Sequence, residues 1–89
     1  MNDKEICICA AILTDEGRII RGHRHHNCRD TAIGMRLTVN SHYSRQGFIT
    51  SWNNFVGREL AYKLQIEAGI PSVAPGGYRG EQLFSEDLY

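Results

Sequence analysis

The stretch ICICAAILTDEGRIIRGH, residues 6–23, decides the fold. Residues 6–14 are apolar with β-branched side chains at intervals, and Asp15-Glu16-Gly17 is a turn sequence. Apolar residues then resume with Ile19 and Ile20. Two such runs on either side of a short turn predict a β-hairpin.

A second hairpin is predicted farther along the chain. The segment QGFITS, residues 46–51, is typical of a short strand. Trp52, Asn53 and Asn54 then form a turn that leads into Phe55 and Val56. The two hairpins together supply the strands of a small antiparallel sheet.

A first helix is predicted between the two hairpins. Asn27 or Asp30 can cap its start, and the residues around 32–37 are compatible with a helix. Gly34 lies in the middle of this segment and weakens its helical character.

A second helix is predicted over residues 57–68. Leu60, Leu64 and Ala68 recur there at helical spacing with Ala61 adjacent, and Gly69 supplies a C-terminal stop. The apolar face formed by these residues is expected to cover one side of the sheet.

These elements predict an α+β fold in one domain, residues 1–89, with the small antiparallel sheet packed against two helices. Residues 71–80 contain both prolines and three of the nine glycines, so a loop is expected there. Residues 83–89 mix apolar side chains with acids and are expected to dock against the domain. Because the core is small and sheet edges are exposed, we expect at least a dimer.

Composition restricts the possible partners. The 89 residues carry ten Lys and Arg against ten Asp and Glu, so there is no overall positive charge to attract long nucleic acid. Eight of the ten basic residues are Arg, the side chain best suited to bidentate phosphate contacts and to stacking on bases. This bias favours a compact phosphorylated ligand, although an ordinary solvated surface is also compatible with it.

Three cysteines and a polar, charged start indicate a reducing compartment, and we expect the protein in the cytoplasm. Cys7 and Cys9 lie two apart in one predicted strand and so cannot easily pair with each other. The longest apolar run, residues 6–13, is too short to span a bilayer, and no membrane partner is expected.

The densest polar cluster is RGHRHHNC, residues 21–28, and it has three interpretations. Arg21, Arg24, the histidines and a helix N-terminus can converge on a phosphate. The histidines and Cys28 can instead ligate a transition metal. The histidines can also be structural side chains with satisfied hydrogen bonds. Permanent positive charge beside a divalent cation is unfavourable, so no metal and no cofactor are expected.

Catalysis has little support in the sequence. No arrangement of a nucleophile, a base and an oxyanion donor is marked, and no Gly-rich phosphate loop is present. We therefore expect a binding protein and no enzyme. Two alternatives stay open: a module that binds a host protein, and a small metal-dependent phosphodiesterase with a site formed by His23, His25, His26 and Cys28.

Several strings resemble the small phage proteins of the first Thoeris anti-defence type, which act as sponges. The resemblance covers nearly the whole chain in the same order and is carried by residues 8–12, 22–28, 46–51, 55–61 and 83–89. The strings HRHHNC, residues 23–28, and SEDLY, residues 85–89, are its most specific parts.

The resemblance implies that the chain sequesters cyclic ADP-ribose-type messengers, such as glyco-cyclic ADP-ribose, without cleaving them. Phage would thereby evade Thoeris or CBASS defence in the host bacterial cytoplasm. It also implies a homo-oligomer, a dimer assembling into a hexamer, and uptake of cyclic trinucleotides or dinucleotides as further ligands.

The resemblance also implies particular ligand-binding residues. Arg24 is expected to contact a phosphate and stack on a base, and Phe48 to be the adenine platform. Asn54 is expected to contact the base or ribose, and Arg79 a phosphate. His26 and Arg58 complete the predicted ligand-binding set.

Overall fold

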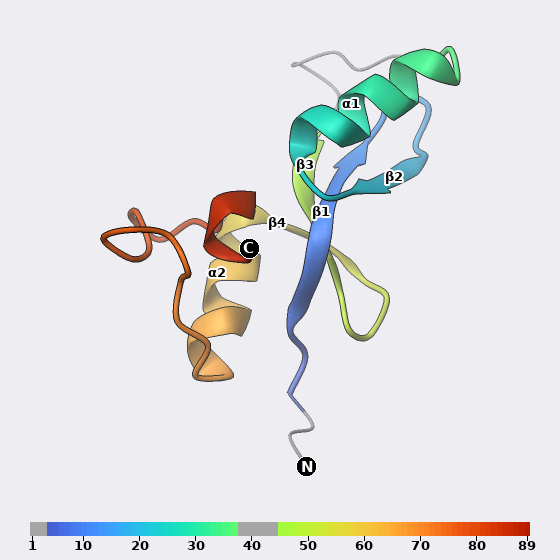
Figure 1. The fold of residues 1–89 in the computed structure, drawn as a ribbon. Helices are drawn as coiled ribbons and strands as arrows, with labels where there is room; N and C mark the ends of the chain where they lie inside the picture. Colours follow the sequence, from blue (N-terminus) through green and yellow to red (C-terminus); the bar gives the residue numbers. More distant parts are fainter. Residues whose placement is uncertain (1–3, 38–44) are drawn as a thin grey trace.

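The computed structural model describes residues 4–37 and 45–89 (Figure 1). Four strands form one antiparallel sheet in the order β2-β1-β3-β4, and two helices pack on it. The α+β prediction is therefore confirmed. Along the chain the elements are β1 (Cys7–Leu13), β2 (Ile19–Gly22), α1 (His25–Gly34), β3 (Arg45–Thr50), β4 (Phe55–Gly57), α2 (Arg58–Glu67) and the 3₁₀-helix η1 (Ser85–Asp87).

Both predicted hairpins are present, and their turns have the expected chemistry. In the β1–β2 turn, Gly17 has a φ of 83°, and its N–H donates to the Thr14 carbonyl at 2.9 Å. In the β3–β4 turn, Asn53 has a φ of 63°, and its N–H donates to the Thr50 carbonyl at 2.9 Å. Glycine and asparagine are the residues that most readily adopt this left-handed conformation.

Both helices cover the same face of the sheet. The α1 residues Cys28 and Ala32 pack with Ala10, Ile12 and Ile20 in one core cluster. A second cluster brings Ala61 of α2 together with side chains from the sheet and the C-terminal segment, namely Cys7, Phe48, Val56 and Leu83. Ala10 pairs directly with Phe48 across β1 and β3, so the two clusters share one side of the sheet.

Helix α1 begins earlier than the sequence predicted. Arg24 is its N-cap residue, and His25 is its first helical residue. The expected cap, Asn27, lies within the first turn and acts from there, since its Oδ1 accepts the Arg24 backbone N–H at 3.1 Å. The helix ends at Gly34, so the predicted helical residues beyond that position lie outside it.

Helix α2 occupies the predicted region, and Gly69 follows it with a φ of 74°. The predicted buried face is confirmed in part: Ala61 is buried and Leu64 packs against the core, but Leu60 is 51% exposed and the polar Gln65 is buried. Gln65 is buried because its Oε1 accepts the Cys7 backbone N–H at 2.8 Å. The small Ala61 side chain allows α2 to approach the sheet closely.

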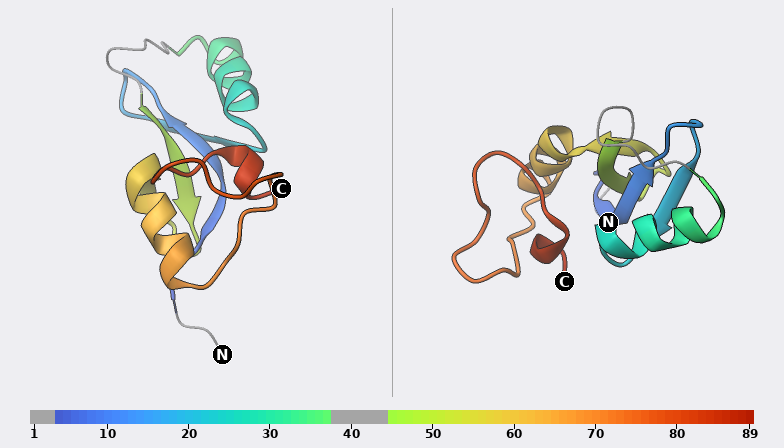
Figure 2. Two further views of the ribbon diagram at one scale, coloured as in Figure 1. Left: turned by 90° about the vertical axis from the view of Figure 1, so that its left-hand side faces the viewer. Right: turned by 90° about the horizontal axis from the view of Figure 1, so that it is seen from above.

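The C-terminal segment, residues 83–89, docks as predicted. Leu83 is fully buried, and its backbone N–H donates to the Arg58 carbonyl at 3.0 Å. In the left view of Figure 2, η1 lies across the sheet between α1 and α2. The loop that leads to it contains the expected glycines, and Gly76, Gly77 and Gly80 all have positive φ values.

The three cysteines are free thiols. Cys7 and Cys28 are buried, and burial raises their thiol pKa values to about 12 and about 11. In the part of the chain that the structure describes, neither the length nor the apolar content of any helix is sufficient to cross a bilayer.

Candidate functional site

The N-termini of the two helices meet near the middle of the sheet. Strand β2 ends at Gly22, which lies beside Ala10 of β1. Strand β4 ends at Gly57 opposite Gly47, and Gly47 lies beside Ala11, the next residue along β1. Two residues join β2 to α1, and β4 runs directly into α2, so α1 and α2 start at the same level of the sheet, next to η1 (Figure 1). Helix N-termini carry partial positive charge and attract anions.

An open cavity of about 310 Å³ lies at this junction. It is lined by the start of α1, the first residue of α2 and the C-terminal segment: Arg24, His25, His26, Arg58, Phe84, Ser85 and Glu86. Ligand pockets in proteins span roughly 300–1,000 Å³, so this cavity is at the lower limit for a nucleotide-sized ligand.

Arg24 joins helix α1 to the C-terminal segment. Its Nη2 donates to the Tyr89 main-chain oxygen at 2.5 Å, and its guanidinium carbon lies 5.2 Å from the centre of the Tyr89 ring. The Tyr89 ring also stacks on His23, with ring centres 4.1 Å apart. The Arg24 Nη1 is buried and makes no hydrogen bond within the described residues. An unpaired buried donor costs about 1–3 kcal/mol, so an additional acceptor at this point would be stabilising.

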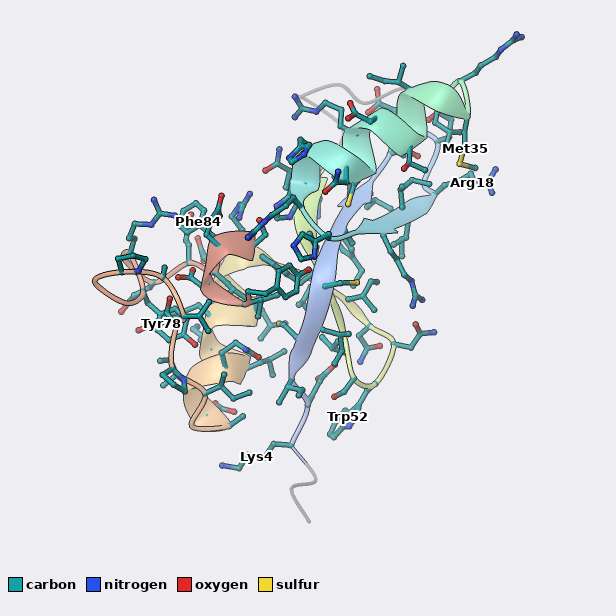
Figure 3. The ribbon with its side chains drawn as sticks, viewed as in Figure 1. Lys4, Arg18, Met35, Trp52, Tyr78 and Phe84 are labelled. Atoms are coloured by element: carbon teal, nitrogen blue, oxygen red, sulfur yellow. The ribbon has the colours of Figure 1, made fainter. Side chains whose placement is uncertain are left out.

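Arg58 and Arg79 both lie over Phe84, which Figure 3 labels. Their guanidinium carbons are 4.8 and 4.6 Å from the centre of the Phe84 ring. Arg58 is also held by hydrogen bonds to the Leu83 carbonyl, at 2.8 Å, and to the Gln46 Oε1, at 2.5 Å. Burial lowers the pKa of Arg58, yet an arginine side chain stays charged in proteins.

The histidines of the cluster have separate environments. The His25 Nε2 donates to the Gly47 carbonyl at 2.8 Å, and burial lowers the pKa of this imidazole. His26 is exposed at the edge of the cavity, whereas His23 stacks on Tyr89. Cys28 is a fully buried residue of α1 that faces the core. In residues 4–37 and 45–89, no three His, Cys, Asp or Glu side chains are grouped so that they could hold a metal ion.

Glu86 brings a carboxylate into this arginine-rich cavity. The side chain is exposed and lines the cavity. Its carboxyl pKa is lowered by a hydrogen bond from its own backbone amide and, to a smaller extent, by the charges of Arg24 and Arg79. Glu86 therefore carries a negative charge at neutral pH.

Four of the six predicted ligand-binding residues are brought to this junction. Arg24, His26 and Arg58 line the cavity directly. Arg79 adjoins it through Phe84. These four come from α1, α2 and the C-terminal loop, segments that are far apart in the sequence.

Phe48 and Asn54 lie elsewhere. Phe48 is fully buried in the core, so it presents no face on which a base could stack in this structure. Its ring contacts the edge of the His25 ring, with centres 5.2 Å apart, and thus supports the cavity from beneath. The Asn54 Nδ2 donates to the Glu5 Oε2 at 2.9 Å, in the turn next to the Thr50–Cys7 end of the sheet.

Sequence reasoning did not single out Phe84, Ser85 or Glu86 as site residues, although they line the cavity. They belong to a segment that was expected only to dock. Nothing in the local sequence shows that docking brings this segment to the N-termini of both helices. Phe84 presents a half-buried aromatic ring at the cavity, where Phe48 presents none.

Comparisons with known proteins identify a family. A family model described as "Phage T4 y16D protein" matches residues 6–89. No curated protein and no solved structure matches the chain. The description indicates a phage setting and names no activity or ligand. Because the match covers nearly the whole chain, this protein belongs to the phage T4 y16D protein family.

Proposed function

We propose that the protein is a non-catalytic sponge that binds and sequesters cyclic ADP-ribose-type immune messengers in the cavity between α1, α2 and η1. The observation that carries this proposal is the convergence of Arg24, His26 and Arg58 on one cavity where two helices begin. Sequestration would let phage evade Thoeris or CBASS defence inside the bacterial cytoplasm.

The charge of the cavity supports an anionic ligand. Arg24 and Arg58 line the cavity and Arg79 adjoins it through Phe84, so these arginines outnumber the Glu86 carboxylate and leave an excess of positive charge. The partial positive charges of two helix N-termini add to this. A compact anionic ligand would match that excess, and its phosphate oxygens could accept hydrogen bonds from the arginine guanidinium groups.

The cavity also offers a stacking surface for the base of such a ligand. Arg58 and Arg79 lie over the half-buried Phe84 ring, so their planar guanidinium groups are held in place. Guanidinium planes stack on nucleobases, and aromatic or arginine stacking contributes about 1–3 kcal/mol per base. Phe84 with its two arginines therefore takes the role of the adenine platform in this proposal.

Binding without cleavage agrees with the protonation of the two buried cysteine thiols. The thiol pKa values of Cys7 and Cys28 lie far above neutral, so both sulfurs stay protonated and are poor nucleophiles. The residues that a metal-dependent phosphodiesterase would use have separate environments: His23 stacks on Tyr89, His25 is hydrogen-bonded to the Gly47 carbonyl, and Cys28 is buried. The proposal therefore needs no metal and no cofactor.

The first test is isothermal titration of the purified protein with glyco-cyclic ADP-ribose. We expect saturable binding and, after the complex is heated, recovery of intact ligand by chromatography. Recovery of a cleaved product would contradict the sponge. An absence of heat with this messenger and with cyclic di- and trinucleotides, together with a host protein recovered in a pull-down, would favour a protein-binding module instead.

Oligomer formation is part of the proposal, as a dimer that assembles into a hexamer. The side chains of Cys9, Leu13, Ile19 and Phe55 share the sheet face opposite to α1 and α2, according to the strand register. In the described residues no helix covers this face, and Ile19 is 45% exposed. An apolar sheet face of this kind is a common site of self-association.

Sedimentation at micromolar concentration is therefore expected to give a dimer or a larger species. Ile19→Asp should shift the protein toward monomer, because a charge would be buried in the interface. Ile33→Asp is the matched control, since Ile33 is equally apolar and 62% exposed but lies on α1. A monomeric wild-type protein would contradict the oligomer.

A further inference from the structure

We infer that Glu86 is a specificity-determining residue, a fixed negative charge that excludes ligands with terminal phosphate monoesters and admits ligands whose phosphates are all diesters. The inference rests on the proposed function, because it concerns which nucleotides the same cavity accepts. The cavity must bind a messenger in a cell that also contains abundant nucleoside triphosphates.

The arginines do not depend on Glu86 for their positions. Arg24 is held by the Tyr89 main-chain oxygen. Arg58 is held by the Leu83 carbonyl and by Gln46, and Arg79 is stacked on Phe84. Their guanidinium groups can therefore keep this arrangement when the Glu86 charge is removed.

The Glu86 carboxylate is bonded to its own backbone amide and, over a long distance of 3.5 Å, to the Ser85 Oγ, and its side chain is exposed. The negative charge of Glu86 interacts electrostatically with Arg24 and Arg79, and also with His25 and Arg58. The carboxylate thus contributes a negative potential to the whole cavity and stays exposed to a ligand that enters it.

The number of negative charges on a ligand decides whether the cavity accepts it. A phosphodiester carries one negative charge, whereas a terminal phosphate monoester carries about 1.5 to 2 at neutral pH. A diphosphate diester therefore brings two negative charges to the cavity, whereas a nucleoside triphosphate brings about four. Each additional ligand charge is repelled by Glu86, and this repulsion weakens as ionic strength rises.

The test compares ADP-ribose with ATP on the wild type and on Glu86→Gln. Both probes contain adenosine, but only ATP has a terminal phosphate monoester. We expect Glu86→Gln to tighten ATP binding about tenfold and ADP-ribose binding about threefold at low ionic strength, with a smaller difference at physiological salt. Isothermal titration at both salt concentrations measures the ratio of the two dissociation constants.

Glu81→Gln is the matched control. Glu81 is also exposed and lies in the loop just before η1, but it lines a different hollow, together with Glu59, Lys63 and Gln82. This variant should leave the ratio unchanged. Thermal unfolding of both variants should match the wild type, because neither carboxylate is buried.

The possible results separate this inference from the proposed function. If the wild type binds the messenger and Glu86→Gln leaves the ATP to ADP-ribose ratio unchanged, the charge filter is overturned and the sponge stands. If Glu86→Gln weakens both probes, Glu86 instead accepts a ligand hydrogen bond, which also overturns the filter. If the wild type fails to bind the messenger but Glu86→Gln gains ATP binding, the filter is supported and the sponge fails. Failure of both proteins to bind all three ligands overturns both.

Discussion

Phe48→Ala is expected to lower the free energy of unfolding by about 3–5 kcal/mol, the range typical of a fully buried phenylalanine replaced by alanine. Phe48 has no exposed surface and packs with Val56, Ala61 and Leu83. Its replacement would leave a void between the sheet, α2 and the C-terminal segment. Small domains have stabilities of about 5–15 kcal/mol, so the variant should be close to unfolding. Chemical denaturation followed by circular dichroism measures the change.

Two further variants separate a core role for Phe48 from a ligand-binding role. Phe48→Leu keeps most of the volume and should cost much less than Phe48→Ala. Phe84→Ala removes a half-buried ring at the cavity, so it should weaken messenger binding more than it affects stability. A stable Phe48→Ala protein that no longer binds the messenger would show that the ring is exposed in solution and acts as the adenine platform.

The hairpins were predictable because their turns are encoded by a few local residues. Gly17 and Asn53 adopt positive φ values that most other residues avoid, and both lie between apolar runs. The end of α2 was predictable for the same reason, through Gly69. Such signals act over a few residues and do not depend on the rest of the fold.

The buried face of α2 was predictable only in part: Ala61 and Leu64 face the core as expected, but the place of Gln65 depends on a contact from elsewhere in the chain. Gln65 is buried by its bond to the Cys7 backbone, 58 residues away in the sequence. Once Gln65 and Ala61 face the sheet, Leu60 is turned to the outside. Helical spacing indicates that a helix exists, but the Cys7 backbone N–H, through its bond to Gln65, helps to decide which side of the helix is buried.

The candidate site was predictable only in part, for a related reason. Arg24 and Arg58 each follow a strand that ends in glycine, and the register places both strand ends at one level of the sheet. Asn54 lies in a turn next to the other end of β1, where Cys7 pairs with Thr50. Sheet register therefore decides which of the polar residues meet, and register depends on pairing between distant segments.

Arg24→Ala is expected to weaken messenger binding about 10- to 150-fold, because hydrogen bonds to a charged group contribute about 1.5–3 kcal/mol each. The loss should appear in the dissociation constant measured by isothermal titration, with the fold retained. Arg18→Ala is the control, since Arg18 lies in the β1–β2 turn and Figure 3 shows it far from Phe84. Arg18→Ala should bind as tightly as the wild type.

Arg24 also holds the C-terminal segment, so its effect on binding must be separated from that contact. Tyr89→Ala removes the ring that stacks on His23 and lies beside Arg24, while the guanidinium stays. If Arg24 contacts the messenger, Arg24→Ala should weaken binding far more than Tyr89→Ala does. Arg24→Lys should fall between wild type and Arg24→Ala, because an ammonium keeps the charge and loses the planar fork. Equal losses in Arg24→Ala and Tyr89→Ala would instead make Arg24 a structural residue, since both variants would then act by releasing the segment that carries Phe84 and Glu86.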